Sequence, residues 1–398
     1  MVGAGVAGIT AARGIRELDP DVRIEIYTRE PYLYYYRPRL PDLVAGEVNP
    51  ADIIAHDRDW YSERKIDVRV SEPVTSVDVD ARAITLEGGR RVGYGTLLLA
   101  SGADPFVPPI EGADLAGVFV LRTIDDALAI RDRATGSRRA VVIGGGLLGL
   151  ETARGLELAG LGVTVLEGAD WLLPRQLDER AGQILSEDVK RMGIDVRASA
   201  KVSRIEGSGG ATGVSLDDGT VYPGELVLIS TGIRSAVGFV EDSGIEIGRG
   251  IVVDPEMRTS APSVFAAGDV AELPGMPGGN IPVATAQAEA AARCIAGVAS
   301  AGGPTAVSYN TLKIAGIDVF SVGETSCSDP SCSEHVHEDR EAGIYRKVVV
   351  KDGAIAGAMV VGSGTGVTQL NDLVQKRTDV SRWGDAVARE DFDFDGLS

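Results

Sequence analysis

Residues 1–8, MVGAGVAG, and residues 140–149, AVVIGGGLLG, decide the fold of this chain. Each stretch contains the pattern GxGxxG, in which the missing side chains let backbone N–H groups approach a pyrophosphate at the positive end of a helix. One copy is a weak signal, because glycine is common. Here each copy opens a helix-like run and is followed by a strand-like run, as dinucleotide binding requires. Two copies predict two dinucleotide sites, and the usual reason to hold two dinucleotides is hydride transfer between them.

Length and composition limit the class of protein. A chain of 398 residues is too long for one ordinary core, so two or three domains are expected. The 44% hydrophobic content and the 51 glycines suit an α/β protein with many tight turns. No apolar run approaches the roughly 20 residues needed to cross a bilayer, and the N-terminus enters the glycine motif without a signal peptide. We therefore expect a cytoplasmic protein.

Charge and cysteine content exclude further classes. The formal net charge of −19 argues against nucleic acid and anionic membranes as partners, because both need a basic face. Only three cysteines occur, which excludes a disulfide framework.

An internal repeat organises the chain. Residues 96–100, TLLLA, and residues 226–230, LVLIS, are short apolar runs typical of buried parallel strands, and each ends at a glycine turn. Beyond residue 304 the pattern changes to alternating strands. The expected fold class is α/β, with two Rossmann-like doubly wound dinucleotide-binding domains and a small C-terminal α+β domain. The expected boundaries are residues 1–110 with 236–304 for the first domain, 111–235 for the second and 305–398 for the third.

Five segments in this order resemble the FAD- and NAD(P)-dependent pyridine nucleotide oxidoreductases. They are the first glycine motif, Ala100-Ser101-Gly102, the second glycine motif, Ser230-Thr231-Gly232, and the segment from Thr259-Ser260 to Ala267-Gly268-Asp269. The resemblance covers the chain to about residue 300. Within the family, Tyr36-Arg37-Pro38 and Leu121-Arg122-Thr123 are similar to the branch of rubredoxin reductases, ferredoxin reductases and the flavin part of nitrite reductase large subunits.

The resemblance implies that the first domain binds FAD. The acid that binds the ribose usually ends the second strand, where this chain has Thr28, so we assign the ribose to Glu30, the nearest acid. A solvated charge at the strand end is the alternative interpretation of Glu30. The resemblance further assigns phosphate contacts to two arginines and the ribityl hydroxyls to one aspartate. The implied FAD set is Gly3, Gly5, Val6, Ala7, Gly8, Glu30, Arg37, Ala100, Ser101, Gly102, Arg122 and Asp269.

The second domain is expected to bind NADH. Glu167 ends the second strand of that domain, where a carboxylate accepts hydrogen bonds from a free 2′-hydroxyl and repels a 2′-phosphate. This predicts NADH over NADPH. In relatives a glutamate at the place of Glu151 lies near the nicotinamide, and a charge on the helix surface is an equal alternative. The remaining cofactor-binding positions are Gly144, Gly146, Leu147, Leu148, Gly149 and Gly232.

A missing cysteine indicates the subclass. Disulfide reductases and flavin-coupled NADH oxidases or peroxidases of this family place a reactive cysteine beside the flavin, but residues 37–46, RPRLPDLVAG, contain none. The resemblance therefore implies hydride transfer from NADH to the flavin, then direct electron transfer to a small rubredoxin- or ferredoxin-like protein. An NADH oxidase that uses oxygen and a flavin-bound NADH-sensing interaction protein are the alternatives. The sequence does not decide between a monomer and a homodimer.

Two further features give local expectations. Cys327, Cys332, His335 and His337 are plausible zinc ligands, but their spacing is unusual, and we rank a plain surface loop ahead of a metal site or a disulfide. At the other end, only Met1 and Val2 precede the first glycine turn. Because the first strand of a Rossmann domain is central, its loss should be costly, and we expect FAD retention to be the weak point of the chain as written.

Overall fold

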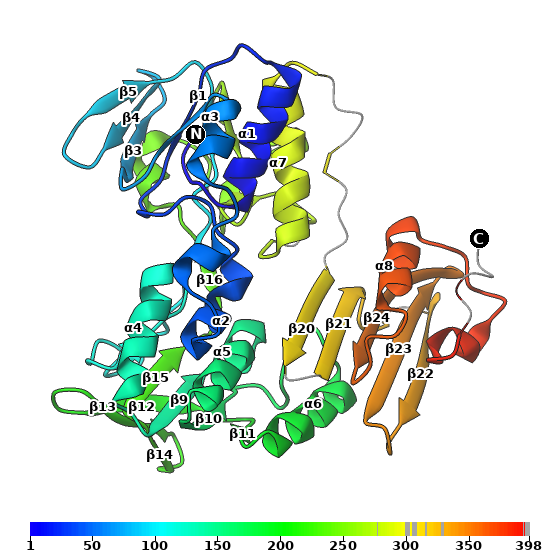
Figure 1. Ribbon diagram of the computed structural model, residues 1–398. Coiled ribbons are helices and arrows are strands. Elements are labelled where there is room, and N and C mark those ends of the chain that lie inside the picture. The colour runs from blue at the N-terminus through cyan, green and yellow to red at the C-terminus, as the bar shows by residue number, and fades with distance from the viewer. Residues whose placement is uncertain are drawn as a thin grey trace. The chain divides into compact units, whose positions relative to one another are not determined.

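The computed structural model describes residues 1–276, 278–298, 303–304, 309–314, 317–327, 330–392 and 394 (Figure 1). The chain forms two compact units. The first contains Met1–Arg37, Pro50–Asp104 and Ile233–Ser308, and the second contains Pro38–Asn49, Pro105–Gly232 and Tyr309–Ser398. The division into three domains stays a prediction. Within the described residues, no helix is long and apolar enough to cross a membrane.

A parallel sheet forms the centre of the first unit. β1 (Ile24–Tyr27) pairs with β2 (Ile66–Arg69), and β6 (Leu97–Leu99) pairs with β18 (Val264–Ala266). Val2 joins the two pairs through parallel bridges to Tyr27 and Leu99. The Val2 N–H donates to the Leu98 carbonyl at 2.9 Å, and the Tyr27 N–H donates to the Met1 carbonyl at 2.9 Å. The short N-terminal segment therefore holds the central strand position, and weak FAD retention stays a prediction.

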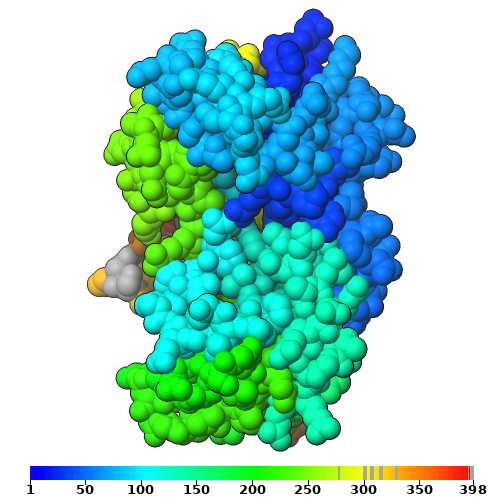
Figure 2. Space-filling model, turned by 90° about the vertical axis from the view of Figure 1, so that its left-hand side faces the viewer, coloured from blue at the N-terminus to red at the C-terminus, as the bar shows by residue number. Residues whose placement is uncertain are grey.

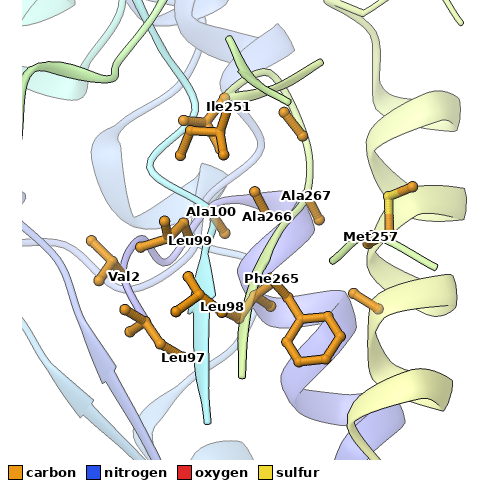
Figure 3. Close-up of a cluster of buried hydrophobic side chains, with 14 of the residues drawn as sticks. Val2, Leu97, Leu98, Leu99, Ala100, Ile251, Met257, Phe265, Ala266 and Ala267 are labelled. Carbon is orange, nitrogen blue, oxygen red and sulfur yellow. The ribbon is translucent and has the colours of Figure 1, made fainter. Parts of the chain in front are cut away.

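Apolar side chains explain why this sheet lies inside the unit. All three residues of β6 are at most 1% exposed, as expected for a strand that is covered on both faces (Figure 3). Helices α1 (Val6–Leu18) and α7 (Ile281–Ile295) lie side by side against it (Figure 1). Their contact is close because small residues face each other, and a Cβ on Gly14 would lie 3.1 Å from the Ala292 Cβ.

Smaller elements complete the first unit. An antiparallel sheet of β3 (Val74–Asp78), β4 (Ala83–Leu86) and β5 (Arg91–Gly93) lies on its outside, where Figure 2 shows it in light blue at the top. The other elements are η1 (Arg37–Arg39) at the boundary between the units, η2 (Pro50–Ile53), α3 (Arg58–Glu63), β7 (Ala103–Pro105) paired with β16 (Ile233–Ser235), η3 (Gly238–Ser243), and β17 (Ile251–Val252) paired with β19 (Ala271–Glu272).

The second unit repeats the plan of the first. Its five-stranded parallel sheet has the order β11 (Asp195–Arg197), β10 (Gly162–Leu166), β9 (Arg139–Ile143), β15 (Leu226–Ile229) and β8 (Val118–Phe119). β9, which leads into the second glycine turn, is central, as Val2 is in the first unit. The helices are α2 (Leu40–Ala45), α4 (Ile124–Thr135), α5 (Leu147–Leu158) and α6 (Glu179–Arg191). The expected pair of Rossmann-like folds is confirmed.

Two antiparallel sheets belong to the same unit. The smaller consists of β12 (Val202–Gly207), β13 (Ala211–Leu216) and β14 (Val221–Pro223). The larger has the order β20 (Tyr309–Ile314), β21 (Ile317–Gly323), β24 (Ala354–Val361), β23 (Ile344–Lys351) and β22 (Cys332–Asp339), followed in the chain by α8 (Val367–Lys376) and η4 (Gly384–Ala388). This α+β arrangement confirms the alternating strands expected after residue 304.

Candidate functional site

The first glycine turn leaves no room for side chains at its outer positions. Gly3 has φ +102°, and a Cβ there would lie 2.1 Å from the Ala100 carbonyl oxygen. A Cβ on Gly8 would lie 2.1 Å from the Gly3 carbonyl oxygen. Both distances are far inside van der Waals contact, so the tight turn and the close packing of α1 on the sheet require glycine.

The second turn reproduces this geometry. Gly144 has φ +115°, and its Cβ would lie 2.2 Å from the Ser230 carbonyl oxygen. A Cβ on Gly149 would lie 2.2 Å from the Gly144 carbonyl oxygen. Ser230 and Ala100 follow equivalent strands, β15 and β6, so the two turns share their contacts as well as their sequence pattern.

The middle glycines, Gly5 and Gly146, are different, because nothing in the protein requires them. Each precedes its helix with an ordinary extended backbone, at φ −79° and −78° respectively. Apart from the chain neighbours, no atom of the described residues lies within 4 Å of an ideal Cβ. Neither helix has a side-chain cap at this end. A methyl group would therefore fill only the space in front of the helix N-terminus. That open space, lined by N–H donors, fits a pyrophosphate.

Glu167 is fixed against the second turn. Its Oε2 accepts a hydrogen bond from the Gly145 N–H at 2.7 Å, and its Oε1 accepts one from the Ala169 N–H at 2.8 Å. The carboxylate thus lies beside the glycine turn, directly after β10, which is where a ribose hydroxyl is bound in this type of fold.

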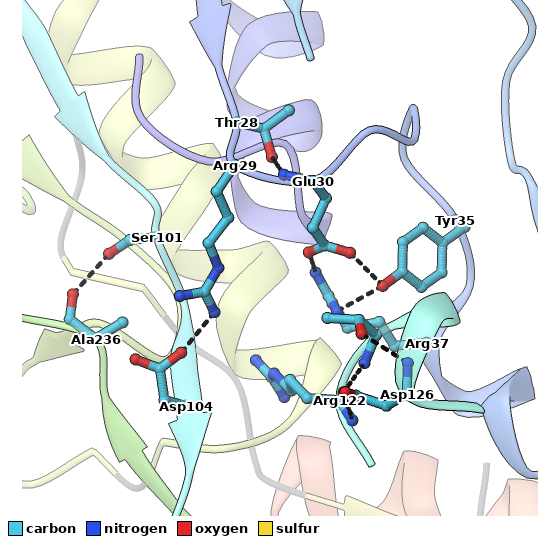
Figure 4. Close-up of polar contacts among 11 residues, drawn as sticks. Thr28, Arg29, Glu30, Tyr35, Arg37, Ser101, Asp104, Arg122, Asp126 and Ala236 are labelled. Atoms are coloured by element: carbon cyan, nitrogen blue, oxygen red, sulfur yellow. Dashed lines mark hydrogen bonds and ion pairs between the residues drawn. The ribbon is translucent and has the colours of Figure 1, made fainter. Parts of the chain in front are cut away.

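The expected acid of the first unit is part of a small polar network (Figure 4). The Glu30 carboxylate accepts hydrogen bonds from Arg37 Nη2 at 2.5 Å and from the Tyr35 hydroxyl at 2.6 Å. Arg37 Nη1 in turn donates a hydrogen bond to the Tyr35 hydroxyl oxygen at 2.8 Å. Burial lowers the Arg37 pKa, but Tyr35 and Glu30 outweigh burial, so the pKa lies above its usual value. The structure therefore brings two predicted residues together and adds Tyr35, which was not among the predicted site residues. Thr28 itself is buried.

Other predicted residues of the first unit cluster near strand ends. The Ser101 hydroxyl donates to the Ala236 carbonyl at 3.0 Å, which ties the turn after β6 to the returning chain (Figure 4). After β18, the Asp269 carbonyl accepts a hydrogen bond from the Ser235 hydroxyl at 2.7 Å. The Gln287 side chain is 2% exposed, and its Oε1 accepts a hydrogen bond from the Gly268 N–H at 2.8 Å. The backbone beside Asp269 is thereby held from two sides.

Arg122 and Glu151 belong to the second unit. Arg122 precedes α4, and its N–H donates to Asp126 at 2.9 Å next to a Thr123–Asp126 capping box. Glu151 lies on α5, where burial and then the charge of Asp42 raise its pKa to about 7. Asp42 comes from α2, which packs on α5. Glu151 is therefore a partly buried acid rather than a solvated surface charge.

The cysteine and histidine cluster does not have the form that we ranked first. Cys327 and Cys332 form a disulfide, and His335 Nδ1 lies 2.7 Å from the Asp385 carboxylate. In the described part of the chain, no group of three or more His, Cys, Asp or Glu is placed to hold a metal ion. The expectation of an unbonded loop was wrong, because the two thiols lie within bonding distance of each other.

Two matched glycine turns on two Rossmann-like folds define the class of proteins that carry two dinucleotide-binding folds in one chain. The chain matches the pyridine nucleotide-disulphide oxidoreductase family over residues 1–292 and the C-terminal domain of rubredoxin NAD+ reductases over residues 309–378. It belongs to the pyridine nucleotide-disulphide oxidoreductase family.

Individual relatives agree with this class. NAD(P)H nitrite reductase of Bacillus subtilis is 34% identical over 96% of this chain, which spans 47% of that protein. The chain thus covers about half the length of this relative. NADH-rubredoxin oxidoreductase of Clostridium acetobutylicum is 30% identical, with 98% of this chain and 97% of that protein covered. A solved ferredoxin reductase of Rhodopseudomonas palustris has a TM-score of 0.91 at 25% identity, covering 99% of this chain and 98% of that one.

Proposed function

We propose that this chain passes hydride from NADH to FAD and then electrons to a small rubredoxin- or ferredoxin-like protein. The observation that carries the proposal is the pair of geometrically matched glycine turns, because holding two dinucleotides serves transfer between them. The relatives that reduce rubredoxin and ferredoxin support the choice of acceptor, as does the match of residues 309–378 to a rubredoxin reductase domain.

The first unit would hold FAD by shape and charge. Gly5 and the N-terminus of α1 would receive the pyrophosphate, and Glu30, oriented by Arg37 and Tyr35, would accept hydrogen bonds from the ribose. Asp269 would bind the ribityl hydroxyls. When bound, FAD supplies the flavin that takes up hydride and releases electrons. The protein's part is then positioning and charge rather than acid–base chemistry.

The second unit would select and orient NADH. Gly146 and the N-terminus of α5 would receive its pyrophosphate, and Glu167 would accept the 2′-hydroxyl. A 2′-phosphate would meet the Glu167 carboxylate at short range, which disfavours NADPH. We place Glu151 near the nicotinamide, where a carboxyl with a pKa of about 7 would be only partly ionised at neutral pH.

The segment from η1 through α2 to Gly46 supplies no thiol, since residues 37–46 contain no cysteine. We therefore propose that electrons leave the flavin directly. The cytoplasmic location stays a prediction.

Anaerobic stopped-flow mixing with NADH tests this function. We expect fast bleaching of the flavin absorbance, slow reoxidation by air and fast reoxidation by oxidised rubredoxin or ferredoxin. Fast reoxidation by air would instead support an oxidase, and slow bleaching with a stable charge-transfer complex would support an NADH sensor. Parallel assays with rubredoxin, ferredoxin, quinones and oxygen identify the acceptor.

A further inference from the structure

A third glycine-rich turn lies in the C-terminal sheet domain, away from both Rossmann-like folds in sequence. Residues 362–366, GSGTG, connect β24 to α8. Gly366 is the N-cap of α8 with φ +71°, and no side chain caps this helix. Thr368 and Gln369 in the first turn of α8 are exposed, so the positive end of this helix lies at the surface.

A buried cation lies beneath this turn. Arg346, the third residue of β23, is 0% exposed, and its Nε, Nη1 and Nη2 have no hydrogen-bond partner among the residues that the structure describes. Its Nη2 lies 3.4 Å from the place of a Cβ on Gly366, so the guanidinium reaches the N-cap of α8. Burial lowers the Arg346 pKa, and the Glu390 carboxylate acts in the opposite direction. A buried guanidinium carries five N–H donors, and without an acceptor in the described part of the chain its charge is left for an anion to balance.

Beside the 362–366 turn lie a cavity that could admit an anion and carboxylates that would compete with it. A cavity of about 470 Å³ beside the same turn is lined by Gly364, Thr365, Val367 and Asp318, among others. The Ser363 hydroxyl donates to Glu390 at 2.5 Å, so the chain after η4 brings a carboxylate close to the turn. Phe394 stands over Gly366, with its Cε2 2.7 Å from the place of a Cβ. Two carboxylates near the turn, Asp318 and Glu390, would keep the affinity for a free anion modest.

We propose that Arg346, the 362–366 turn and the N-terminus of α8 form a binding site for a small oxyanion of the phosphate class. Glu390 occupies the neighbourhood of this site when no oxyanion is present, and Phe394 moves when one enters. Phosphate fits because its oxygens can accept from the planar guanidinium fork and from helix N–H groups together. The site is independent of the dinucleotide sites and of the proposed electron transfer.

The test is a titration of the flavin-loaded full chain with inorganic phosphate at constant ionic strength, followed by ³¹P line broadening and by the melting temperature. We expect saturable binding that stabilises the protein. Arg346→Met should weaken phosphate binding at least about tenfold, since hydrogen bonds to a charged group are lost. Lys376→Met, which removes one positive charge at the other end of α8, should bind like the wild type. Equal binding by the Arg346→Met and wild-type proteins, or no saturable binding, would overturn the proposal.

Glu390→Gln gives a second test that does not depend on the folding of the Arg346 variant. Removal of the competing carboxylate should tighten phosphate binding several-fold, whereas unchanged or weaker binding would count against the site. The same chemistry could be presented by free phosphate or by a nucleotide phosphate. A parallel titration with AMP separates the two sources. AMP binding that is lost in Arg346→Met would show that this site accepts a nucleotide phosphate, whereas AMP binding that persists in this variant belongs to another site.

Discussion

The Glu167 carboxylate accepts a hydrogen bond from the Gly145 N–H at 2.7 Å, which fixes the acid after β10 against the glycine turn before α5. The second carboxylate oxygen accepts a hydrogen bond from the Ala169 N–H, so both oxygens are held by backbone groups rather than by a mobile side chain. The carboxylate therefore has a defined orientation before any nucleotide binds. This preorganisation supports a role in nucleotide selection.

Replacement of Glu167 tests that role. Glu167→Ala should lower kcat/KM for NADH about tenfold and raise it for NADPH, because a charged acceptor for the 2′-hydroxyl and a repulsion against the 2′-phosphate both disappear. Steady-state kinetics with both nucleotides give the ratio. Glu187→Ala, on the exposed face of α6, is the control and should leave it unchanged. An unaltered ratio in Glu167→Ala would show that selection lies elsewhere.

The middle glycines of the two turns provide a matched pair. Gly5→Ala should reduce FAD retention and Gly146→Ala should raise the Kd for NADH, each by about tenfold or more, because the new methyl group occupies the pyrophosphate space. Neither change meets a protein atom within 4 Å, so the melting temperature should fall only slightly. Flavin absorbance per polypeptide and NADH titration are the measurements.

Gly95→Ala and Gly209→Ala are the controls for this pair. Both glycines have open space around an ideal Cβ and lie outside the two turns, one in each unit. They should keep full flavin content and NADH affinity. Full flavin content in Gly5→Ala would contradict the assignment of this turn to FAD.

The pKa of Glu151 predicts a pH dependence of stability. Burial, with the Asp42 charge, raises this pKa from 4.5 to about 7 in the folded protein. The folded state then binds the proton more tightly than the unfolded state, so this contribution is complete below pH 4.5 and is lost as the pH rises through about 7. Glu151→Gln should therefore be more stable than the wild type at pH 8 by roughly 1 to 2 kcal/mol, after allowance for partial solvent contact.

Denaturant unfolding of the ligand-free proteins at pH 5 and pH 8 measures this difference. The advantage of Glu151→Gln should shrink at pH 5, where the wild-type carboxyl is protonated. Glu187→Gln should show no such trend. A constant difference between Glu151→Gln and the wild type across this range would mean that Glu151 titrates normally.

Polar contacts connect α6 to the C-terminal sheet within the second unit. The Tyr345 hydroxyl donates to the Asp178 carboxylate at 2.8 Å, and Lys347, whose side chain is 5% exposed, lies 3.0 Å from both Asp178 and Glu334. Tyr345→Phe should cost about 1 kcal/mol of unfolding free energy, and Lys347→Met about 2 kcal/mol, because a buried ionic partner is removed. Tyr309→Phe is the exposed control. Losses below about 0.3 kcal/mol in both variants would show that the network adds no stability.

The sequence predicted most of the fold because its strongest signals are local. The apolar run 97–99 became a strand buried on both faces, and the glycines at 3, 8, 144 and 149 stand where a Cβ would collide with backbone. Sequence spacing alone could not find the Tyr35–Glu30–Arg37 network, because aromatic runs pack in many ways. It also misjudged the Cys327–Cys332 pair, since residue order does not show whether two thiols come within bonding distance.

The acidic composition bears on the proposed electron acceptor. Small iron–sulfur electron carriers are usually acidic, and this chain carries a net charge of −19. Productive docking then needs a local basic surface, so the rate of acceptor reduction should depend on ionic strength in a way that net charge alone does not predict.

The sequence by itself determined the two dinucleotide turns and the class of chemistry, because glycine at fixed spacing encodes the close approach of backbone to pyrophosphate. Tertiary structure decided the remaining features, because distant segments supply their partners. Folding places Val2 between two strand pairs and sets Glu167 against Gly145. It also puts Asp42 beside Glu151 and buries Arg346 beneath Gly366 with no acceptor among the described residues. Each of these depends on burial and through-space contact, which residue order does not specify.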